Sequence, residues 1–272
     1  MIYSVYQEPT IMTIKKILQK IQKFIPGDLL QRMQNLNSTL LYEVILRFRS
    51  QPLELSSKSA MVFSPHQDDE TFGCGGMIAL KRGQLIPVTV VFLTNGQGNG
   101  GSKSSIKEEI IQIRKQEAES ALKILGVKQS DIYFLDKPDG TLLDLDSELR
   151  QKTIEQIMEL LKKYNPQEVY VPHYKDCHCD HEATYILVKE AIAQLKAEVE
   201  LLQYPIWIFW RAPLFIMLKL KDIAAARKLS ITKVKAQKEQ AIASYNSQVE
   251  SLPRNFVNRF LGSYEIFFKV EL

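Results

Sequence analysis

Short runs of β-branched and apolar residues alternate with longer segments of helical periodicity from residue 60 to residue 195. A chain with this alternation forms a mainly parallel sheet with helices on both faces, because each helix returns the chain to the start of the next parallel strand. The pattern therefore predicts an α/β domain of the Rossmann-like type. The expected strands are 60–63, 88–93, 132–135 and 168–171, and the expected helices are 73–82, 105–125, 147–164 and 180–195.

An apolar segment beyond residue 200 needs separate treatment. Residues 201–220 approach membrane-spanning length, but prolines and cations interrupt them, so we reject a transmembrane helix. We expect a strand followed by an aromatic-rich loop within 204–217, which rims a pocket, touches lipid or belongs to the core. A helix over 222–244 and a closing strand over 264–270 complete the prediction.

A basic, helical N-terminal extension over 1–58 is expected to precede the α/β domain of 59–272. Apolar residues recur at helical spacing over 11–25 with lysines between them, and Pro26-Gly27 ends the pattern. Such a basic amphipathic helix lies on an anionic membrane surface, or packs on its own domain or on a partner chain. The second arrangement is the commoner one, and both stay open here.

The net charge of +4 falls entirely on the N-terminal part of the chain. Residues 1–60 carry eight Lys or Arg against four Asp or Glu, so residues 61–272 are balanced. A balanced domain is not a general binder of polyanions, and nucleic acid is not an expected partner. Three cysteines cannot pair evenly, and we find no secretory signal pattern. We therefore expect a cytoplasmic protein, not a secreted one. These patterns predict no particular oligomeric state.

All four histidines of the chain follow predicted strands. His66 follows the 60–63 strand, while His173, His178 and His181 follow the 168–171 strand. Ligands of an open α/β sheet bind at the carboxyl ends of the strands, so both segments should reach the same edge. The clustering predicts one functional site there.

The residues around these histidines have the chemistry of a catalytic metal site. Asp68 and Asp69 follow His66, and one of these carboxylates can bind a metal while the other faces its open side. His178 and His181 lie three residues apart at a helix entrance, where both can reach one site. Two nitrogens and one carboxylate oxygen leave a fourth position open, as in catalytic zinc centres. Each segment alone would also fit a loop histidine or a helix-capping acid cluster.

Both motifs together resemble those of the metal-dependent de-N-acetylases of the PIG-L or LmbE-like family, typified by N-acetylglucosaminyl-phosphatidylinositol deacetylase. The resemblance covers about residues 60–270. It rests on His66-Gln67-Asp68-Asp69-Glu70 with Gly73-Cys74-Gly75-Gly76, on His178-Cys179-Asp180-His181, and on the shorter matches Thr94-Asn95-Gly96, Arg114-x-x-Glu117-Ala118 and Ser247-Gln248.

The resemblance implies a role for five residues at the metal. His66, Asp69 and His181 would hold zinc, with ferrous iron as an alternative. Asp68 would be the general base that takes a proton from a water molecule held by the metal. His178 would donate a hydrogen bond to the oxyanion or protonate the departing amine.

Two further residues, Arg114 and Asn95, would contact the substrate according to the resemblance. Arg114 would bind hydroxyl groups or a phosphate of the substrate, although it fits a surface ion pair with acids of its own helix equally well. Asp139-Gly140 is expected to form a turn near the pocket and is given no role. Gln67 stands where many family members carry proline, which changes the stiffness of the loop without removing a ligand.

The three cysteines and His173 have more than one interpretation. Cys177 and Cys179 flank His178 and could compete as zinc ligands, although inert thiols pointing away are the simpler interpretation. Cys74 lies among glycines that suggest packing. His173 is a partner of the metal-site residues or only a loop residue, and we favour the latter.

The expected function is that of a zinc-dependent hydrolase. It would remove the N-acetyl group from an N-acetylated sugar or conjugate of N-acetylglucosamine type, with a lipid-linked substrate among the options. The alternatives are a metal-dependent amidase with a non-sugar substrate, and a non-catalytic, membrane-associated relative. A nucleotide-binding loop is excluded at residues 96–104, because Ser102 occupies the position where that motif requires lysine.

Overall fold

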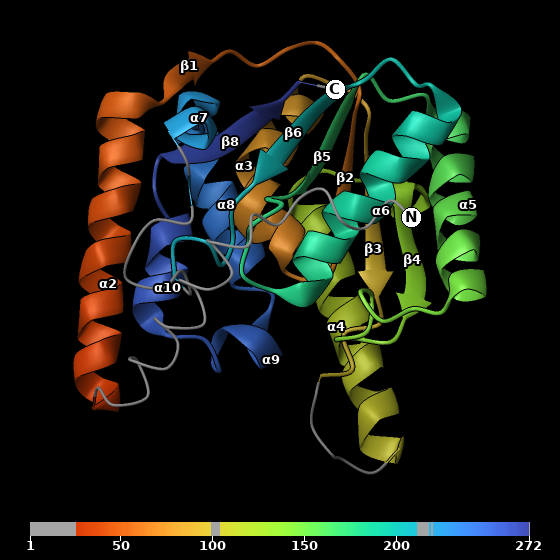
Figure 1. Ribbon diagram of the computed structural model, residues 1–272, viewed down its shortest axis with the longest axis horizontal. Coiled ribbons are helices and arrows are strands. Elements are labelled where there is room, and N and C mark those ends of the chain that lie inside the picture. Colours follow the sequence, from red (N-terminus) through yellow and green to blue (C-terminus); the bar gives the residue numbers. More distant parts are fainter. Residues whose placement is uncertain (1–25, 99–103, 211–217, 219, 272) are drawn as a thin grey trace.

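The computed structural model describes residues 26–98, 104–210, 218 and 220–271, in which one eight-stranded sheet lies between two layers of helices (Figure 1). The strands are β1 (Gln51–Leu53), β2 (Ala60–Ser64), β3 (Val88–Thr94), β4 (Ile132–Lys137), β5 (Glu168–Pro172), β6 (Glu200–Tyr204), β7 (Ala226–Ser230) and β8 (Tyr264–Val270). The main helices are α2 (Gly27–Val44), α3 (Asp69–Gly83), α4 (Ser104–Ile124), α5 (Ser147–Tyr164), α6 (Cys179–Leu195) and α8 (Lys235–Ile242). Shorter elements are the π-helical turn η1 (Ile45–Arg49), α7 (Leu220–Ala224), α9 (Asn246–Val249) and α10 (Arg254–Phe260).

The sheet is mainly parallel, in the order β1-β7-β8-β6-β5-β2-β3-β4. Only β8 runs against its neighbours, and it pairs with β6 on one side and β7 on the other. Strands β2, β3 and β5 are buried along their whole length, as expected for parallel strands covered on both faces. The Rossmann-like α/β prediction is confirmed.

Two apolar clusters cover the two faces of the sheet. One cluster brings α3, α4 and α8 onto β2 and β3, with Phe72 and Leu122 at its centre. The other brings α5 and α6 onto the opposite face, around Ile157 and Val188. Helix α5 and strand β8 have the predicted bounds, and the other helices and strands predicted between residues 60 and 204 differ by a few residues at their ends.

The helix predicted over 222–244 is wrong. Residues 226–230 form strand β7, which lies between β1 and β8, and α8 begins only at Lys235. The segment Ala226–Ser230 contains one alanine, one leucine and two cationic residues, all of which favour helices, but the open edge of β8 offers it backbone hydrogen bonds and buries Ala226 and Leu229. Pairing in the sheet therefore overrides the local helix preference.

The ends of the chain differ from the sequence patterns in their detail. The helix predicted over 11–25 lies outside the described residues, and the described N-terminal helix is α2, which the periodicity did not predict. Strand β1 belongs to the predicted extension yet pairs with β7, and the boundary at residue 58 stays a prediction.

The described part of the aromatic segment belongs to the core. Tyr204, Ile206, Ile208 and Phe209 are all buried, whereas residues 211–217 lie outside the described residues. Among the helices described, none is long and apolar enough to cross a bilayer.

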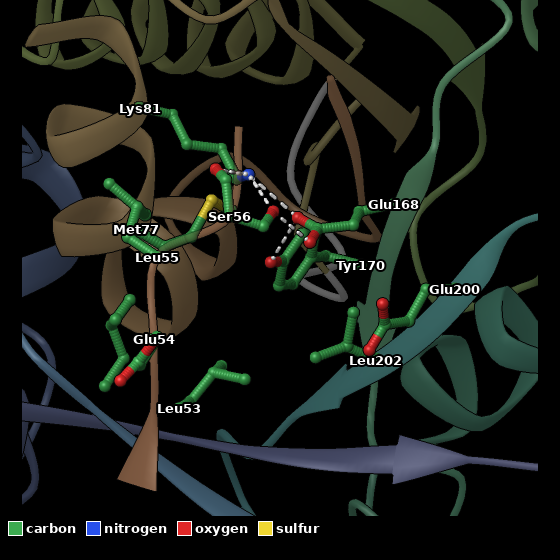
Figure 2. A pocket seen from close by; sticks show the side chains of 11 residues that line it. Leu53, Glu54, Leu55, Ser56, Met77, Lys81, Glu168, Tyr170, Glu200 and Leu202 are labelled. Carbon is green, nitrogen blue, oxygen red and sulfur yellow. Dashed lines mark hydrogen bonds and ion pairs between the residues drawn. The ribbon is translucent and has the colours of Figure 1, made fainter. Parts of the chain in front are cut away.

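A small buried cavity of about 10 Å³ lies at the amino ends of the strands, on the edge opposite the histidines (Figure 2). Lys81 points into it and donates to the carbonyl oxygens of Ser56 and Lys58, at 3.1 and 2.8 Å, while pairing with Glu168 at 2.9 Å. This volume holds about one water molecule, so the cavity does not bind a sugar.

The glycines of helix α3 serve close packing. A Cβ on Gly73 would lie 2.3 Å from the Tyr204 ring, and one on Gly76 would lie 2.4 Å from Ile231. Beside them, Glu265 of β8 accepts hydrogen bonds from the backbone N–H groups of Gly76 and Met77, at 2.6 and 2.8 Å. Lys238 pairs with Glu265 and donates to the Phe72 carbonyl, both at 2.7 Å. A Cβ on Gly75 would lie 3.2 Å from Cγ of Lys238, so this glycine leaves room for the buried ion pair to reach the helix backbone.

Replacing Gly76 with alanine should destabilise the fold by about 2 kcal/mol, because the new methyl group collides with Ile231 in a full core. Chemical denaturation of both proteins measures the difference. The matched control is Gly83→Ala at the end of the same helix, where a Cβ meets no atom within 4 Å. Equal stability of the two variants would contradict the packing role.

Candidate metal centre

The loops after β2 and β5 bring three of the four histidines together. These strands are neighbours in the sheet, so His66 lies beside His178 and His181. The ring centroids are 4.9 Å apart for His66 and His178, 5.3 Å for His66 and His181, and 4.9 Å for His178 and His181. The expectation that both segments reach one sheet edge is therefore met.

Asp69 joins two of these histidines. Its Oδ2 atom lies 3.0 Å from Nδ1 of His66 and 3.1 Å from Nε2 of His181. Ligand atoms of a tetrahedral zinc ion are about 3.3 Å apart, so the Asp69 oxygen lies near that spacing from each of the two nitrogens. His66, His178 and His181 also offer ring nitrogens within 4.8 Å of one another.

The donor set fits a divalent cation. Nε2 of His181 is fully buried and makes no hydrogen bond of normal geometry. Burial alone lowers the pKa of His181, but Asp69 and Asp176 raise that pKa to about 9. Burial raises the pKa of Asp69, yet the two imidazoles beside it hold that pKa well below its usual range. Such a cluster of carboxylate and imidazole groups can exchange protons for a metal ion.

Each candidate ligand histidine has a carboxylate behind it. Asp180 lies 3.1 Å from Nε2 of His66, and Asp139 lies 3.2 Å from the same atom. Asp176 lies 2.7 Å from Nδ1 of His181. Carboxylates in this position orient the ring of a metal ligand and increase its basicity. Sequence reasoning missed Asp176, named Asp180 only as part of the second motif and gave Asp139 no role.

Backbone N–H groups fix Asp176 and Asp180 in turn. Asp176 accepts from Ile206, Trp207 and Ile208 at 2.9–3.0 Å. Asp180 accepts from Gly140 at 2.7 Å and Leu142 at 3.0 Å. The loop after β6 and the turn after β4 therefore hold the two histidines through these carboxylates.

Asp68 lies at the N-terminus of α3 with a backbone φ of 153°, a strained value for a residue other than glycine. Its N–H donates to Glu70 at 3.1 Å, which holds this conformation. Burial, followed by the charge of Asp69, raises the pKa of Asp68 well above its usual range, while Arg114 and His66 oppose the shift. Asp68 is thus a carboxyl with increased basicity beside the donor set.

His178 is half-buried, and burial followed by the nearby imidazoles lowers its pKa to about 4. Its Nδ1 accepts a hydrogen bond from the Asp180 backbone at 3.3 Å. The proton of the neutral ring must therefore sit on Nε2, which makes that atom a hydrogen-bond donor.

The two predicted substrate residues lie at the same edge. The side chain of Arg114 lies against Gly96, since a Cβ atom on Gly96 would be 3.0 Å from Cδ of Arg114. The positive charge of Arg114 acts to lower the pKa of Asp68 and of Asp139. None of the ion pairs between described residues joins it to an acid of α4, which disfavours the surface interpretation. The side chain of Asn95 turns into its own loop and accepts from Gln97 N–H at 3.2 Å.

The C-terminal segment closes around the first motif. Ser247 donates twice to Glu117, with both distances 2.7 Å, and Gln248 donates to the Gln67 carbonyl. Tyr245 donates to Glu70. Two of the shorter motif matches, at Glu117 and at Ser247-Gln248, are thus joined by hydrogen bonds. No motif in the sequence pointed to Tyr245.

The remaining candidates lie away from the donor set or offer a poor ligand. Cys74 is buried in the core, as expected from its glycine neighbours. Cys179 is an exposed residue. Partial burial of its thiol, followed by the negative charge of Asp180, raises the pKa of that thiol, so the thiolate form is disfavoured. His173 is fully buried against Phe268, and burial lowers its pKa to about 3.

Comparison with known proteins agrees with this geometry. Residues 61–192 match the family model described as PIG-L, GlcNAc-PI de-N-acetylase. A probable N-acetyl-alpha-D-glucosaminyl L-malate deacetylase 2 from Bacillus anthracis is 31% identical over 146 residues, which cover 52% of this chain and 62% of the relative. The chain therefore spans less than two thirds of the length of this relative.

Two solved structures share the fold. The N,N'-diacetylchitobiose deacetylase of Pyrococcus horikoshii has a TM-score of 0.60 and 21% identity, over 85% of this chain and 92% of its own. The 4-carboxy-2-hydroxymuconate hydratase of Pseudomonas putida has a TM-score of 0.56 and 23% identity, over 75% and 82%. Because the second is a hydratase, the fold alone does not determine the reaction.

Replacing Asp176 or Asp180 with asparagine should weaken zinc binding about 10- to 100-fold, because each neutral amide supports its histidine less well. Competition with a chromophoric chelator measures the affinity. Asp144→Asn, on the exposed turn before α5, is the control and should bind zinc as the unchanged protein does. Unaltered affinity in both test variants would remove the supporting role.

Proposed function

Because residues 61–192 belong to the PIG-L de-N-acetylase family, we propose that this protein removes the acetyl group from an N-acetylglucosamine-type conjugate by hydrolysis. The observation that carries the proposal is the cluster of His66, Asp69 and His181 with Asp68 beside it. The substrate class comes from the relatives, since one is described as a probable N-acetyl-alpha-D-glucosaminyl L-malate deacetylase and a fold neighbour is an N,N'-diacetylchitobiose deacetylase.

We propose that His66, Asp69 and His181 hold zinc, with ferrous iron as the alternative. Nε2 of His181 makes no hydrogen bond of normal geometry, and two carboxylates support the histidines. Both observations favour this set over three different groups of possible ligands, each of which includes His178 or Asp139. A bound divalent cation supplies Lewis-acid activation of water and of the amide carbonyl. We leave His178 out of the ligand set, so that its Nε2–H group can donate a hydrogen bond to the substrate.

Asp68 is the proposed general base. The raised pKa makes its carboxylate a better proton acceptor than an ordinary exposed aspartate. It takes one proton from the attacking water as the new C–O bond forms. The same proton then passes to the nitrogen when the C–N bond breaks, which yields a free amine and acetic acid, and the acid releases its proton to water as acetate.

His178 is proposed to stabilise the negative charge that develops on the carbonyl oxygen. The Asp180 N–H occupies its Nδ1, so a neutral ring presents Nε2–H to the substrate. This arrangement favours hydrogen-bond donation over the role of a general acid, because a pKa of about 4 leaves the ring neutral at pH 7.

Arg114 is proposed to bind the polar part of the conjugate, through hydroxyl groups or an anionic substituent. Its guanidinium acts on Asp68 and Asp139 in the site rather than on the acids of its own helix. Asn95 lies at the same edge, but its amide already bonds within the loop, so we assign it the weaker contact.

The cellular setting is a further part of the proposal. We infer a cytoplasmic enzyme that meets a small N-acetyl sugar conjugate, without nucleic acid. A lipid-linked conjugate and peripheral membrane contact through residues 11–25 and 204–217 would agree with each other. Within 204–217, only residues 211–217 are candidates for such contact, because residues 204–210 are largely buried.

Asp68→Asn should reduce acetate release from N-acetylglucosaminyl malate or diacetylchitobiose by roughly 10²- to 10⁴-fold while zinc content stays unchanged. His181→Ala should lose zinc and activity together. Chelation should abolish activity in the unchanged protein, and added zinc or ferrous iron should restore it. Elemental analysis and an acetate assay follow both quantities, with Asp144→Asn as the control.

Two results would contradict the proposal. Near-normal turnover of a metal-loaded Asp68→Asn variant would exclude Asp68 as the base. A metal-loaded protein that releases no acetate from malate, chitobiose or phosphatidylinositol conjugates of N-acetylglucosamine would exclude sugar de-N-acetylation.

A further inference from the structure

Helix α2 and turn η1 expose a continuous apolar stripe, which we call the α2 stripe. Its members recur every three or four residues, so they share one side of the helix. They are Leu29 (51% exposed), Met33 (39%), Leu36 (73%), Leu40 (62%), Val44 (36%) and Phe48 (77%). These are half of the large apolar side chains that are exposed among the described residues, and the others do not form a comparable row.

The opposite side of α2 is firmly attached to the domain. Leu41, Tyr42 and Ile45 pack with Phe209 and Phe268 in a separate apolar cluster. Ser38 accepts a hydrogen bond from Arg259 at 2.7 Å, and the Leu46 carbonyl accepts one from Lys228 at 3.0 Å. The stripe is therefore the outward face of a docked helix, at the β1 end of the sheet and away from α5 (Figure 1).

A stripe of this kind costs free energy in water and marks an interaction surface. Burying a leucine side chain contributes about 2 kcal/mol, and contiguous apolar patches of several hundred Å² are rare on monomers unless they bind something. From Leu29 to Phe48 the stripe extends about 28 Å at the rise of an α-helix. A long, narrow apolar face suits the plane of a bilayer interface.

The charge around the stripe distinguishes a membrane from a second copy of the chain. Residues 1–49 carry seven Lys or Arg against three Asp or Glu. Arg32, Arg47 and Arg49 lie exposed on the same helix and turn, where Arg47 pairs with Glu43 and the other two arginines have no ion pair among the described residues. Two copies that met on this face would bring like charges together. A single-helix stripe also offers less area than the roughly 800 Å² that each partner buries in a standard dimer.

We propose that the α2 stripe lies in the surface of an anionic lipid bilayer, with its leucines and Phe48 in the acyl boundary and the arginines at the headgroups. This surface is additional to the catalytic site, and its binding needs no substrate. The segment that precedes α2 in the chain, residues 1–25, carries four further lysines in its sequence. The attraction should therefore depend on anionic lipid and weaken with salt.

Flotation of the full chain with vesicles tests the proposal. The vesicles contain phosphatidylcholine alone or phosphatidylcholine mixed with phosphatidylglycerol. The unchanged protein should float with the anionic vesicles and stay largely in the aqueous layer with the neutral ones. The double variant Leu36→Glu/Leu40→Glu should be recovered at least about tenfold less, because it loses two buried leucines and gains two negative charges.

The matched control is Leu85→Glu/Ile186→Glu, which makes the same chemical change at exposed positions outside the stripe. It should float like the unchanged protein. Circular dichroism melting shows whether each variant keeps its fold, which is expected because all four side chains are exposed.

Three outcomes would overturn the proposal. The first is an unchanged protein that does not float with anionic vesicles. The second is a Leu36→Glu/Leu40→Glu variant that floats as well as the control. The third is a dimer seen by light scattering that this variant splits into monomers, without vesicle binding by either protein. None of these outcomes depends on acetate release, so the acetate assay tests the proposed enzymatic function separately.

Discussion

A chain of alternating buried carboxylates and imidazoles organises the functional edge of this protein. It runs from Asp176 through His181, Asp69 and His66 to Asp180, with neighbouring groups 2.7 to 3.1 Å apart. Each group is costly to bury alone, because its charge or its hydrogen-bonding atoms would lose water. Together they pair with one another, although Nε2 of His181 makes no hydrogen bond of normal geometry, and backbone N–H groups of two further loops hold the ends of the chain. The geometry that suits a metal thus also joins the loops after β2, β4, β5 and β6.

A second buried network holds the helix that begins at this chain of groups. Lys238 and Glu265 meet at the middle of α3 and bind its backbone through the space that the glycines leave. Glu265 comes from β8 and Lys238 from α8, so the C-terminal part of the fold fixes the helix whose first residue is Asp69. An ion pair of this kind is expensive to break, because either partner alone would remain charged in the core.

The sequence predicted the parts of the fold whose signal is local. Strand–helix alternation and the positions of the histidines after strands were sufficient for the sheet and for its functional edge. Strand β7 could not be predicted, because its stability comes from β8, which lies more than thirty residues further along the chain. Asp176 and Tyr245 were missed for the same reason. Their partners come from distant segments, and neither residue type distinguishes a supporting group from an ordinary polar residue. The clustering of the histidines was easier to predict, since imidazoles are rare and four in two places are informative.

Strand β8, the last in chain order, lies inside the sheet between β6 and β7. The β1–β7 pair is joined to the rest of the sheet through it, and α2 and η1 rest on this end of the molecule through Lys228 and Phe268. A growing polypeptide therefore cannot complete the sheet until residues near 270 have been synthesised. Such a long-range pairing makes folding slow and leaves the edges of β6 and β7 open in the meantime. The attachment of α2 through Phe268 and the support of α3 through Glu265 thus both wait for the same late strand.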